Sequence, residues 1–129
     1  MRILALDSAC AAVSVALWRD GAVAARRFDA MVRGQTAALM PMVISVLRDA
    51  GATFDRLDLV AVTVGPGSFT GLRTGLAAAR GIALACGIPV LGVTTLEAVA
   101  YAAAAEAADL GAPDATLLVA LETRRAEIY

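Results

Sequence analysis

The chain opens with three short, mostly apolar stretches that have the pattern of β-strands. Residues 2–7 form a short predicted strand that ends in Asp7, and residues 13–18 alternate in part between apolar and polar side chains. Asp20-Gly21 is a strong signal for a two-residue hairpin, after which residues 22–28 pair back as a third strand. We therefore expect an antiparallel meander of three strands at the start of the chain.

The most informative stretch runs from a buried strand through a glycine-rich loop into a helix. Residues 59–64 are a near-continuous run of β-branched and apolar side chains, which is typical of a strand buried on both faces. In the loop that follows, Ser68 can cap a helix, and Gly65 and Gly67 permit backbone angles that are closed to other residues. The helix then continues to Gly87. Such a turn exposes backbone N–H groups at a helix N-terminus, which makes it a generic anion cradle.

Two predicted helices have more apolar surface than a helix needs to cover one sheet. In the helix at residues 35–50 the apolar arc is roughly twice the ~100° expected of such a helix, and Pro41 gives it a later start or a kink. The helix at residues 72–86 has an apolar side and, next to it, a side of small residues that suits close backbone approach. Each helix is therefore expected to bury two faces. The small side packs either against a helix of the same chain or against a partner chain.

The remaining segments alternate strands and helices. Residues 88–93 form a short parallel strand, and a capping box at residues 94–97 opens a helix that runs through Ala108. Residues 116–121 form a further strand. The resulting order, β-β-β-α-β-α-β-α-β, predicts an α/β fold with a mixed sheet of the ribonuclease-H type, in which an antiparallel three-strand meander is followed by parallel βαβα units.

The end of the sequence predicts the beginning of another unit. Residues 122–125 form a turn, and residues 126–129 start a strand for which the sequence offers no partner. We expect residues 1–121 to form the first half of a larger fold, and residues 122–129 to begin a truncated second half.

Composition narrows the functional classes. The 129 residues include no histidine, which excludes histidine-dependent hydrolysis and histidine metal sites. A net charge of −1 gives the chain no electrostatic reason to bind nucleic acid alone. Cys10 and Cys86 form no CxxC pair and are expected to be reduced core thiols. The longest uncharged run, residues 81–96, is too short for a membrane helix, and without a signal-peptide core the sequence predicts a soluble cytoplasmic protein.

Three nucleotide- or metal-dependent sites fit the sequence poorly. The glycine loop lacks the lysine of a mononucleotide P-loop, and it is one residue too long for the GxGxxG dinucleotide fingerprint. A ribonuclease-H-like nuclease needs several carboxylates around two metal ions, but Asp7 is the only candidate apart from Asp49 at the far end of the first helix. We therefore expect the chain to hold no metal.

Asp7 and Ser8 resemble the first phosphate loop of the actin-like ATPase superfamily, in which an aspartate at the end of the first strand faces the metal of the nucleotide. The plainer interpretation is that Asp7 caps a turn. ATP hydrolysis in that superfamily needs a second, similar half, which we expect this chain to lack. Asp7 and Ser8 are therefore interpreted as a vestigial phosphate loop.

Several motifs together resemble the TsaB (YeaZ) family over essentially the whole chain. The most specific is the glycine loop, which consists of Gly65, Pro66, Gly67, Ser68, Phe69, Thr70 and Gly71 and is followed by Leu72 and Arg73. The other matching segments are residues 3–8, 14–17, 39–41, 87–90 and 94–98. The resemblance implies a scaffold without catalytic residues in the bacterial machinery that makes tRNA threonylcarbamoyladenosine (t6A). In that machinery TsaD carries the catalytic metal and nucleotide, and TsaE is an ATPase.

The resemblance also implies partners and an interface. In this family TsaB pairs with TsaD, or with a second TsaB, through the two helices of this half. ATP or ADP is expected to bind only in the complex. Contact of this subunit with tRNA is expected to be indirect. Together with the two wide helices, this predicts an apolar partner interface that contains Met40, Ile44, Leu47, Gly71, Gly75, Ala78 and Ile82. Replacing Gly75 by Leu is then expected to separate the pair and to leave the monomer folded.

Two other functions remain open from the sequence. An actin-like ATPase acting on its own would place Asp7 and the glycine loop at the phosphates, and a peptidase would act through Ser68 or Cys10 without any identifiable general base. The sequence departs from the family at residues 34–36, where a histidine is usual, and at residues 122–124, where Asp-Ala-Arg is usual. The family's second actin-like half is also expected to be absent.

Overall fold

The chain folds around one mixed sheet of five strands. The computed structural model describes residues 1–109, 111 and 116–121. The strands, in the order in which they neighbour one another, are β3 (Ala22–Ala30), β2 (Ala12–Arg19), β1 (Arg2–Asp7), β4 (Leu59–Thr63) and β5 (Val90–Val93). The first three are antiparallel, whereas β4 runs parallel to β1 and β5 runs parallel to β4. The predicted meander and the ribonuclease-H-like sheet are confirmed.

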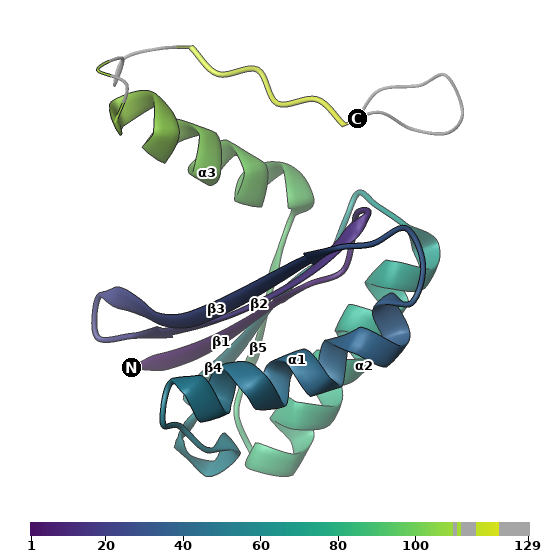
Figure 1. Cartoon of the computed structure of the whole chain (residues 1–129), viewed down its shortest axis with the longest axis vertical. Helices are drawn as coiled ribbons and strands as arrows, with labels where there is room; N and C mark the ends of the chain where they lie inside the picture. The colour runs from purple at the N-terminus through teal and green to yellow at the C-terminus, as the bar shows by residue number, and fades with distance from the viewer. Residues whose placement is uncertain (110, 112–115, 122–129) are drawn as a thin grey trace.

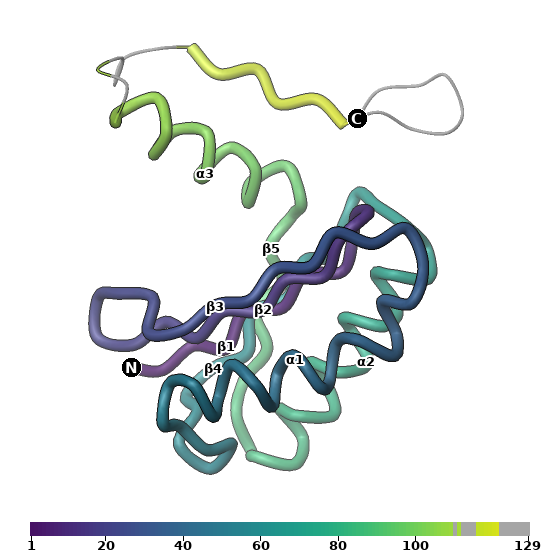
Figure 2. Tube along the Cα trace, in the orientation of Figure 1, coloured from purple at the N-terminus to yellow at the C-terminus, as the bar shows by residue number. Residues whose placement is uncertain are grey.

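Two helices cover one face of this sheet. They are α1 (Gln35–Asp49) and α2 (Phe69–Cys86), which lie side by side below the strands in Figure 1. A short 3-10 turn, η1 (Phe54–Arg56), links α1 to β4 and was not predicted. The third helix, α3 (Thr95–Asp109), lies on the opposite side of the sheet, and the trace in Figure 2 shows it well separated from α1 and α2.

The hydrophobic core lies between the sheet and the α1/α2 layer. Successive side chains of a strand point to opposite faces, so the strands supply every second residue to this core. Those residues are at most 3% exposed, and they are Leu4, Leu6, Val13, Val15, Leu17, Val60 and Val62. Leu39, Val43 and Val46 of α1 and Ala79 of α2 meet them from the other side. Full burial of a Val or Leu side chain contributes about 1.5–3 kcal/mol, so this layer holds the fold together.

The first helix begins earlier than its proline suggested. Gly34, with a φ of 96°, precedes α1, and the helix runs from Gln35 through Pro41 without interruption. Pro41 has no N–H to offer to the preceding turn, and the Ser45 hydroxyl donates a hydrogen bond to the Pro41 carbonyl oxygen at 3.0 Å. The predicted helix at residues 35–50 is therefore confirmed, and of the two alternatives expected of Pro41 the later start is wrong.

The segment after α3 is not the strand that the sequence predicted. Residues 116–121 have no strand hydrogen bonds, and Leu118 is 93% exposed. A strand needs a neighbour to pair with. In the described part of the chain the sheet ends at β5, and in Figure 1 this segment is drawn above α3, which lies between it and the sheet. The predicted turn and second half at residues 122–129 lie outside the described residues.

The third helix begins with the predicted capping box. Thr94 Oγ1 accepts a hydrogen bond from the Glu97 N–H at 3.1 Å, and a Glu97 carboxylate oxygen accepts one from the Thr94 N–H at 2.9 Å. The Thr94 hydroxyl also donates to that carboxylate oxygen at 2.7 Å, and this bond, together with the one from the Thr94 N–H, lowers the pKa of Glu97. Within the described residues, no helix is both long enough and apolar enough to cross a membrane.

Candidate functional site

The glycine loop turns the chain sharply from β4 into α2. The Ser68 side chain accepts a hydrogen bond from the Gly71 N–H at 3.2 Å, which confirms its predicted role as the helix cap. Gly65 has a φ of 110°, a conformation that glycine adopts without strain, as predicted. Gly67 does not have a positive φ, so the conformational reason that the sequence suggested for this glycine is wrong.

Close packing explains Gly67 and the glycines of α2. A Cβ atom at Gly67 would overlap the Ala9 carbonyl oxygen, and one at Gly71 would overlap the Ser8 carbonyl oxygen. At Gly75 a Cβ would lie 2.9 Å from Ser8 Oγ. These three glycines therefore let the glycine loop and the first turns of α2 lie directly on the β1–β2 loop.

Hydrogen bonds fix this contact. The Ser68 N–H donates to the Ala9 carbonyl oxygen at 2.6 Å, and the buried Ser8 hydroxyl donates to the Gly71 carbonyl oxygen at 2.8 Å. Two amides of the predicted anion cradle, those of Ser68 and Gly71, are thus already bonded within the chain. The loop acts as a structural joint between β1, β4 and α2.

Asp7 has the role of a turn cap in this joint. Its Oδ1 atom accepts a hydrogen bond from Thr63 Oγ1 at 2.6 Å and another from the Ala9 N–H at 2.9 Å. The first bond ties the end of β1 to the end of β4, and the second closes the turn after β1. The plainer interpretation of Asp7 therefore fits the structure, and Ser8 is equally engaged, through its hydroxyl, with Gly71.

The predicted interface residues fall into two groups. Leu47, Gly71 and Gly75 are buried within the chain, so the expectation that they face a partner is wrong. The physical reason is that the apolar arc of each helix is wide and its inward half serves the sheet and the β1–β2 loop. Ile82 is only 7% exposed but lines a pocket at the C-terminal half of α2. Met40, Ile44 and Ala78 remain on the outer side of the helices, where a partner can reach them.

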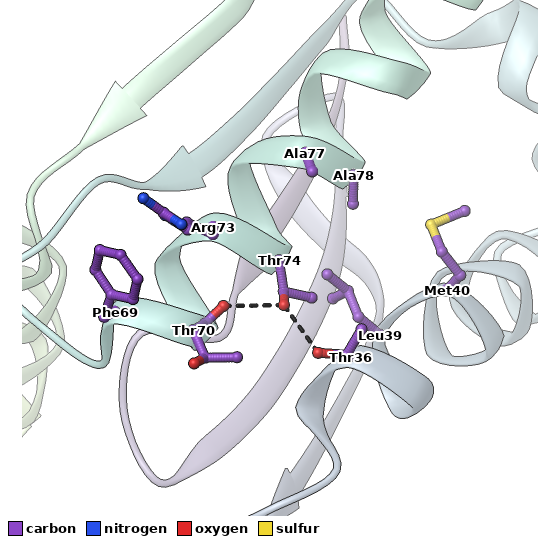
Figure 3. Close-up of a pocket in the computed structure, with 9 residues that line it drawn as sticks. All are labelled: Thr36, Leu39, Met40, Phe69, Thr70, Arg73, Thr74, Ala77 and Ala78. Carbon is purple, nitrogen blue, oxygen red and sulfur yellow. Dashed lines mark hydrogen bonds between the residues drawn. The ribbon is translucent and has the colours of Figure 1, made fainter.

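A groove follows the line where α1 and α2 meet. Figure 3 shows its first part, a pocket of about 550 Å³ lined by Thr36, Leu39, Met40, Phe69, Thr70, Arg73, Thr74, Ala77 and Ala78. A second pocket of about 710 Å³ lies beside Phe54 and Asp55 of η1 and the C-terminal half of α2. Met40 and Ala78 line both pockets, so the two adjoin, and we call them together the groove.

Side-chain contacts at one end of the groove join the two helices and hold the Arg73 guanidinium in place. Thr74 Oγ1 lies 3.0 Å from Thr36 Oγ1 across the helix pair and donates to the Thr70 carbonyl oxygen at 2.9 Å (Figure 3). The Arg73 guanidinium stacks over the Phe69 ring, 3.8 Å from its centroid. A cation–π contact of this kind holds the arginine on the outer surface.

The outer face of the helix pair includes residues that the sequence analysis did not assign to the interface. Phe69, Ala77 and Leu84 are exposed, and Leu84 is 86% exposed. They lie on the side of α2 opposite the buried Gly75 and Ala79. The helical positions 73, 77, 80 and 84 share one side, and this spacing was the signal that could have identified them. We call the solvent-facing side of α1 and α2 the two-helix face.

The cysteines do not form a catalytic centre. Cys86 is half-buried and packs against the core, as predicted, whereas Cys10 is exposed, so its assignment to the core is wrong. Partial burial of the Cys10 thiol, together with the nearby Asp7 carboxylate, raises the pKa of Cys10 above its ordinary value. A nucleophilic cysteine needs the opposite shift.

Cys10 is therefore expected to react slowly with iodoacetamide. Because the pKa is raised, less thiolate is present at any pH below it, and the inflection of the rate–pH profile should lie above that of a cysteine in a short peptide. Alkylation followed by peptide mass mapping separates Cys10 from Cys86. An inflection below that of the peptide would contradict this environment and would favour a nucleophilic role.

Comparisons with known proteins agree with one another. The family model described as "TsaD: tRNA N6-adenosine threonylcarbamoyltransferase" matches residues 30–129. The chain is 41% identical to the tRNA threonylcarbamoyladenosine biosynthesis protein TsaB of Escherichia coli K12, over 100% of this chain and 53% of that protein. It is 36% identical to the Haemophilus influenzae protein of the same name, over 80% of this chain and 43% of that protein.

A solved structure extends the match to three dimensions. YeaZ from Pseudomonas aeruginosa superposes with a TM-score of 0.85 and 33% sequence identity, covering 98% of this chain and 57% of that one. The chain spans about half the length of the curated relatives it matches. It belongs to the TsaB (YeaZ) family, a group related to TsaD, and has the actin-like fold of that family.

Proposed function

We propose that this protein is an accessory subunit of the machinery that makes t6A in tRNA, and that it works by binding a TsaD-type catalytic subunit. Relatives that carry the name tRNA threonylcarbamoyladenosine biosynthesis protein support the pathway. The match to the TsaD family model supports a structural kinship between the two subunits. In this proposal the chain itself has no catalytic residue and contacts tRNA only indirectly.

The observation that carries the proposal is the two-helix face. Ile44 and Phe69 are 56% and 68% exposed, and Met40 and Leu84 add further apolar surface on the same side. Soluble monomers rarely leave a large continuous apolar patch open to water, and such patches mark protein–protein contacts. A groove between two helices is also a common receptor for an apolar helical surface.

The hydrogen bonds of the glycine loop favour a scaffold function rather than an independent ATPase. A phosphate-binding loop offers free amides to its ligand. Here the Ser68 and Gly71 amides are bonded to protein oxygens, and Asp7 Oδ1 is bonded to Thr63 and Ala9. These two amides and this carboxylate oxygen therefore already have partners within the chain. In the complex, ATP or ADP would be held by the partner subunits.

The other expected partners follow from the same proposal. A TsaE-type ATPase would join the complex, and self-association through the two-helix face would compete with binding to the TsaD-type subunit. The whole assembly would act in the cytoplasm, where tRNA is modified.

A reconstituted t6A assay tests this function. We expect the full chain to bind the TsaD-type subunit of its own organism on a size-exclusion column and to raise t6A formation on unmodified tRNA. Binding of ATP to the chain alone should be weak and unaffected by magnesium. Tight, magnesium-dependent ATP binding by the isolated chain, with no effect on t6A formation, would favour the independent ATPase and contradict the scaffold.

A further inference from the structure

The charges on the two-helix face have one sign. Arg48 of α1 and Arg73 and Arg80 of α2 are exposed, and α2 contains no acidic residue. The single acidic residue of α1 is Asp49, whose carboxylate is bonded to Arg27 of β3 at 2.6 Å and lies 3.9 Å from the Arg48 guanidinium. The face is therefore both apolar and basic, although the net charge of the whole chain is −1.

Two of these arginines point directly away from the core. Arg73 and Arg80 are seven residues apart, on the side of α2 opposite Gly75 and Ala79, with the exposed Ala77 between them. Arg73 is held in place by its stacking on Phe69. Among the residues that the structure describes, no carboxylate oxygen lies within 4.0 Å of either guanidinium.

A second copy of the chain matches this face poorly. Face-to-face pairing of two copies would place the exposed Arg73 and Arg80 of both copies in one interface. Among the described residues that line the groove, the one carboxylate is that of Asp55, which lies on η1, 3.6 Å from its own neighbour Arg56. Like charges facing each other across an interface disfavour association, and charge complementarity selects the right partner.

We propose that Arg73 and Arg80 are specificity residues of the two-helix face, and that they select a partner with an apolar helical surface that carries carboxylates opposite them. The same two residues discriminate against a second copy of the chain. This inference rests on the proposed function and identifies the chemistry of the partner at that site: aliphatic side chains for the groove between Met40 and Ala78, and Asp or Glu for the arginine pair.

Charge reversal tests the inference in the full chain. The dissociation constant for the TsaD-type subunit of the same organism would be measured for the wild type, for the double variant Arg73→Glu/Arg80→Glu and for Arg73→Lys/Arg80→Lys. We expect the Glu double variant to bind roughly 100-fold more weakly, or about tenfold for each reversal, because close charge pairs at an interface couple this strongly. The Lys variant should remain within about tenfold of the wild type, since it keeps the charge but loses the planar geometry.

A matched control separates this effect from a general change in charge. Arg26→Glu changes an exposed arginine on β3, outside the two-helix face, and should leave the affinity within about twofold of the wild type. Wild-type affinity should also fall with rising salt, more steeply than that of the Glu double variant. Circular dichroism melts would establish that all variants are folded.

The outcomes distinguish this inference from the proposed function. If the wild type binds the subunit and the Glu double variant binds equally well, the charge assignment is overturned while the scaffold function stands. If the wild type fails to bind the subunit, both are overturned, and a self-dimer tighter than the complex would overturn the charge assignment alone. Selective loss of binding in the Glu double variant, with binding retained by Arg26→Glu, supports both.

Discussion

Replacing Gly71 by Ala is expected to cost the folded chain about 3 kcal/mol or more, and to lower the thermal midpoint sharply. The new Cβ would overlap the carbonyl oxygen of Ser8, which is a backbone atom. That carbonyl cannot move away easily, because hydrogen bonds hold the residues on both sides of it. The Ser8 hydroxyl donates to the Gly71 carbonyl oxygen, and the Ala9 carbonyl oxygen accepts a hydrogen bond from the Ser68 N–H. The first turn of α2 and the β1–β2 loop must therefore separate.

Gly81→Ala is the matched control for this prediction. Gly81 lies in the same helix, and a Cβ there would meet nothing within 4 Å. Alanine at an exposed helical position is favoured over glycine by about 1 kcal/mol, so this variant should be slightly more stable than the wild type. Urea unfolding followed by circular dichroism measures both. If Gly71→Ala unfolds at the same urea concentration as Gly81→Ala, the close contact with Ser8 does not exist as described.

The same geometry changes what Gly75→Leu would show. The sequence predicted that this substitution would separate a pair of subunits and leave the monomer folded. In the structure a Cβ at Gly75 would lie 2.9 Å from Ser8 Oγ and 3.4 Å from a methyl group of Val62. A leucine would push α2 away from β4, so the loss of partner binding would be a consequence of a damaged monomer.

The second large effect is expected at the centre of the two-helix face. Ile44→Glu should weaken binding to the TsaD-type subunit by about 2 kcal/mol or more, roughly 30-fold, because apolar anchors at interface centres contribute this much. Ile44 is 56% exposed in the chain alone, so the charge stays in water and the fold should tolerate it. In the complex the same carboxylate would be buried against an apolar and acidic surface.

Val23→Glu provides the comparison at equal exposure. Val23 is 55% exposed on the edge strand β3, outside the two-helix face. Its substitution should leave binding and stability within about 0.5 kcal/mol of the wild type. Isothermal titration with the catalytic subunit measures the affinities. Equal loss of affinity in both variants would mean that Ile44 has no special place in the contact.

Much of the fold followed from patterns along the chain. The meander was predictable because the hairpin signal at Asp20-Gly21 fixes the pairing of β2 and β3 locally. The predicted strand at residues 116–121 failed because apolar content alone does not provide a neighbour to pair with. The 3-10 turn η1 is too short to have a periodicity of its own.

The candidate site was harder to predict from sequence. A helical wheel gave α2 a wide apolar arc but could not say which half faces inward, since Gly71 and Gly75 suit a partner helix as well as a nearby loop. The deciding contact joins Ser8 to Gly71, 63 positions apart in the sequence. The groove likewise depends on how α1 and α2 lie next to each other, which neither helix specifies alone. Ser68 was predictable because capping is a local effect.

Site-specific labelling of the two-helix face tests most directly whether the protein functions by docking. Ala77 is exposed at the centre of the outer side of α2, so the thiol in the variant Ala77→Cys should react readily with maleimide in the free chain. Ala24→Cys on β3 provides an exposed reference site. With the TsaD-type subunit bound, we expect labelling at position 77 to slow by about tenfold or more while labelling at position 24 stays unchanged, as read by peptide mass mapping. Unchanged labelling at position 77 in a complex that has demonstrably formed would contradict docking through this face.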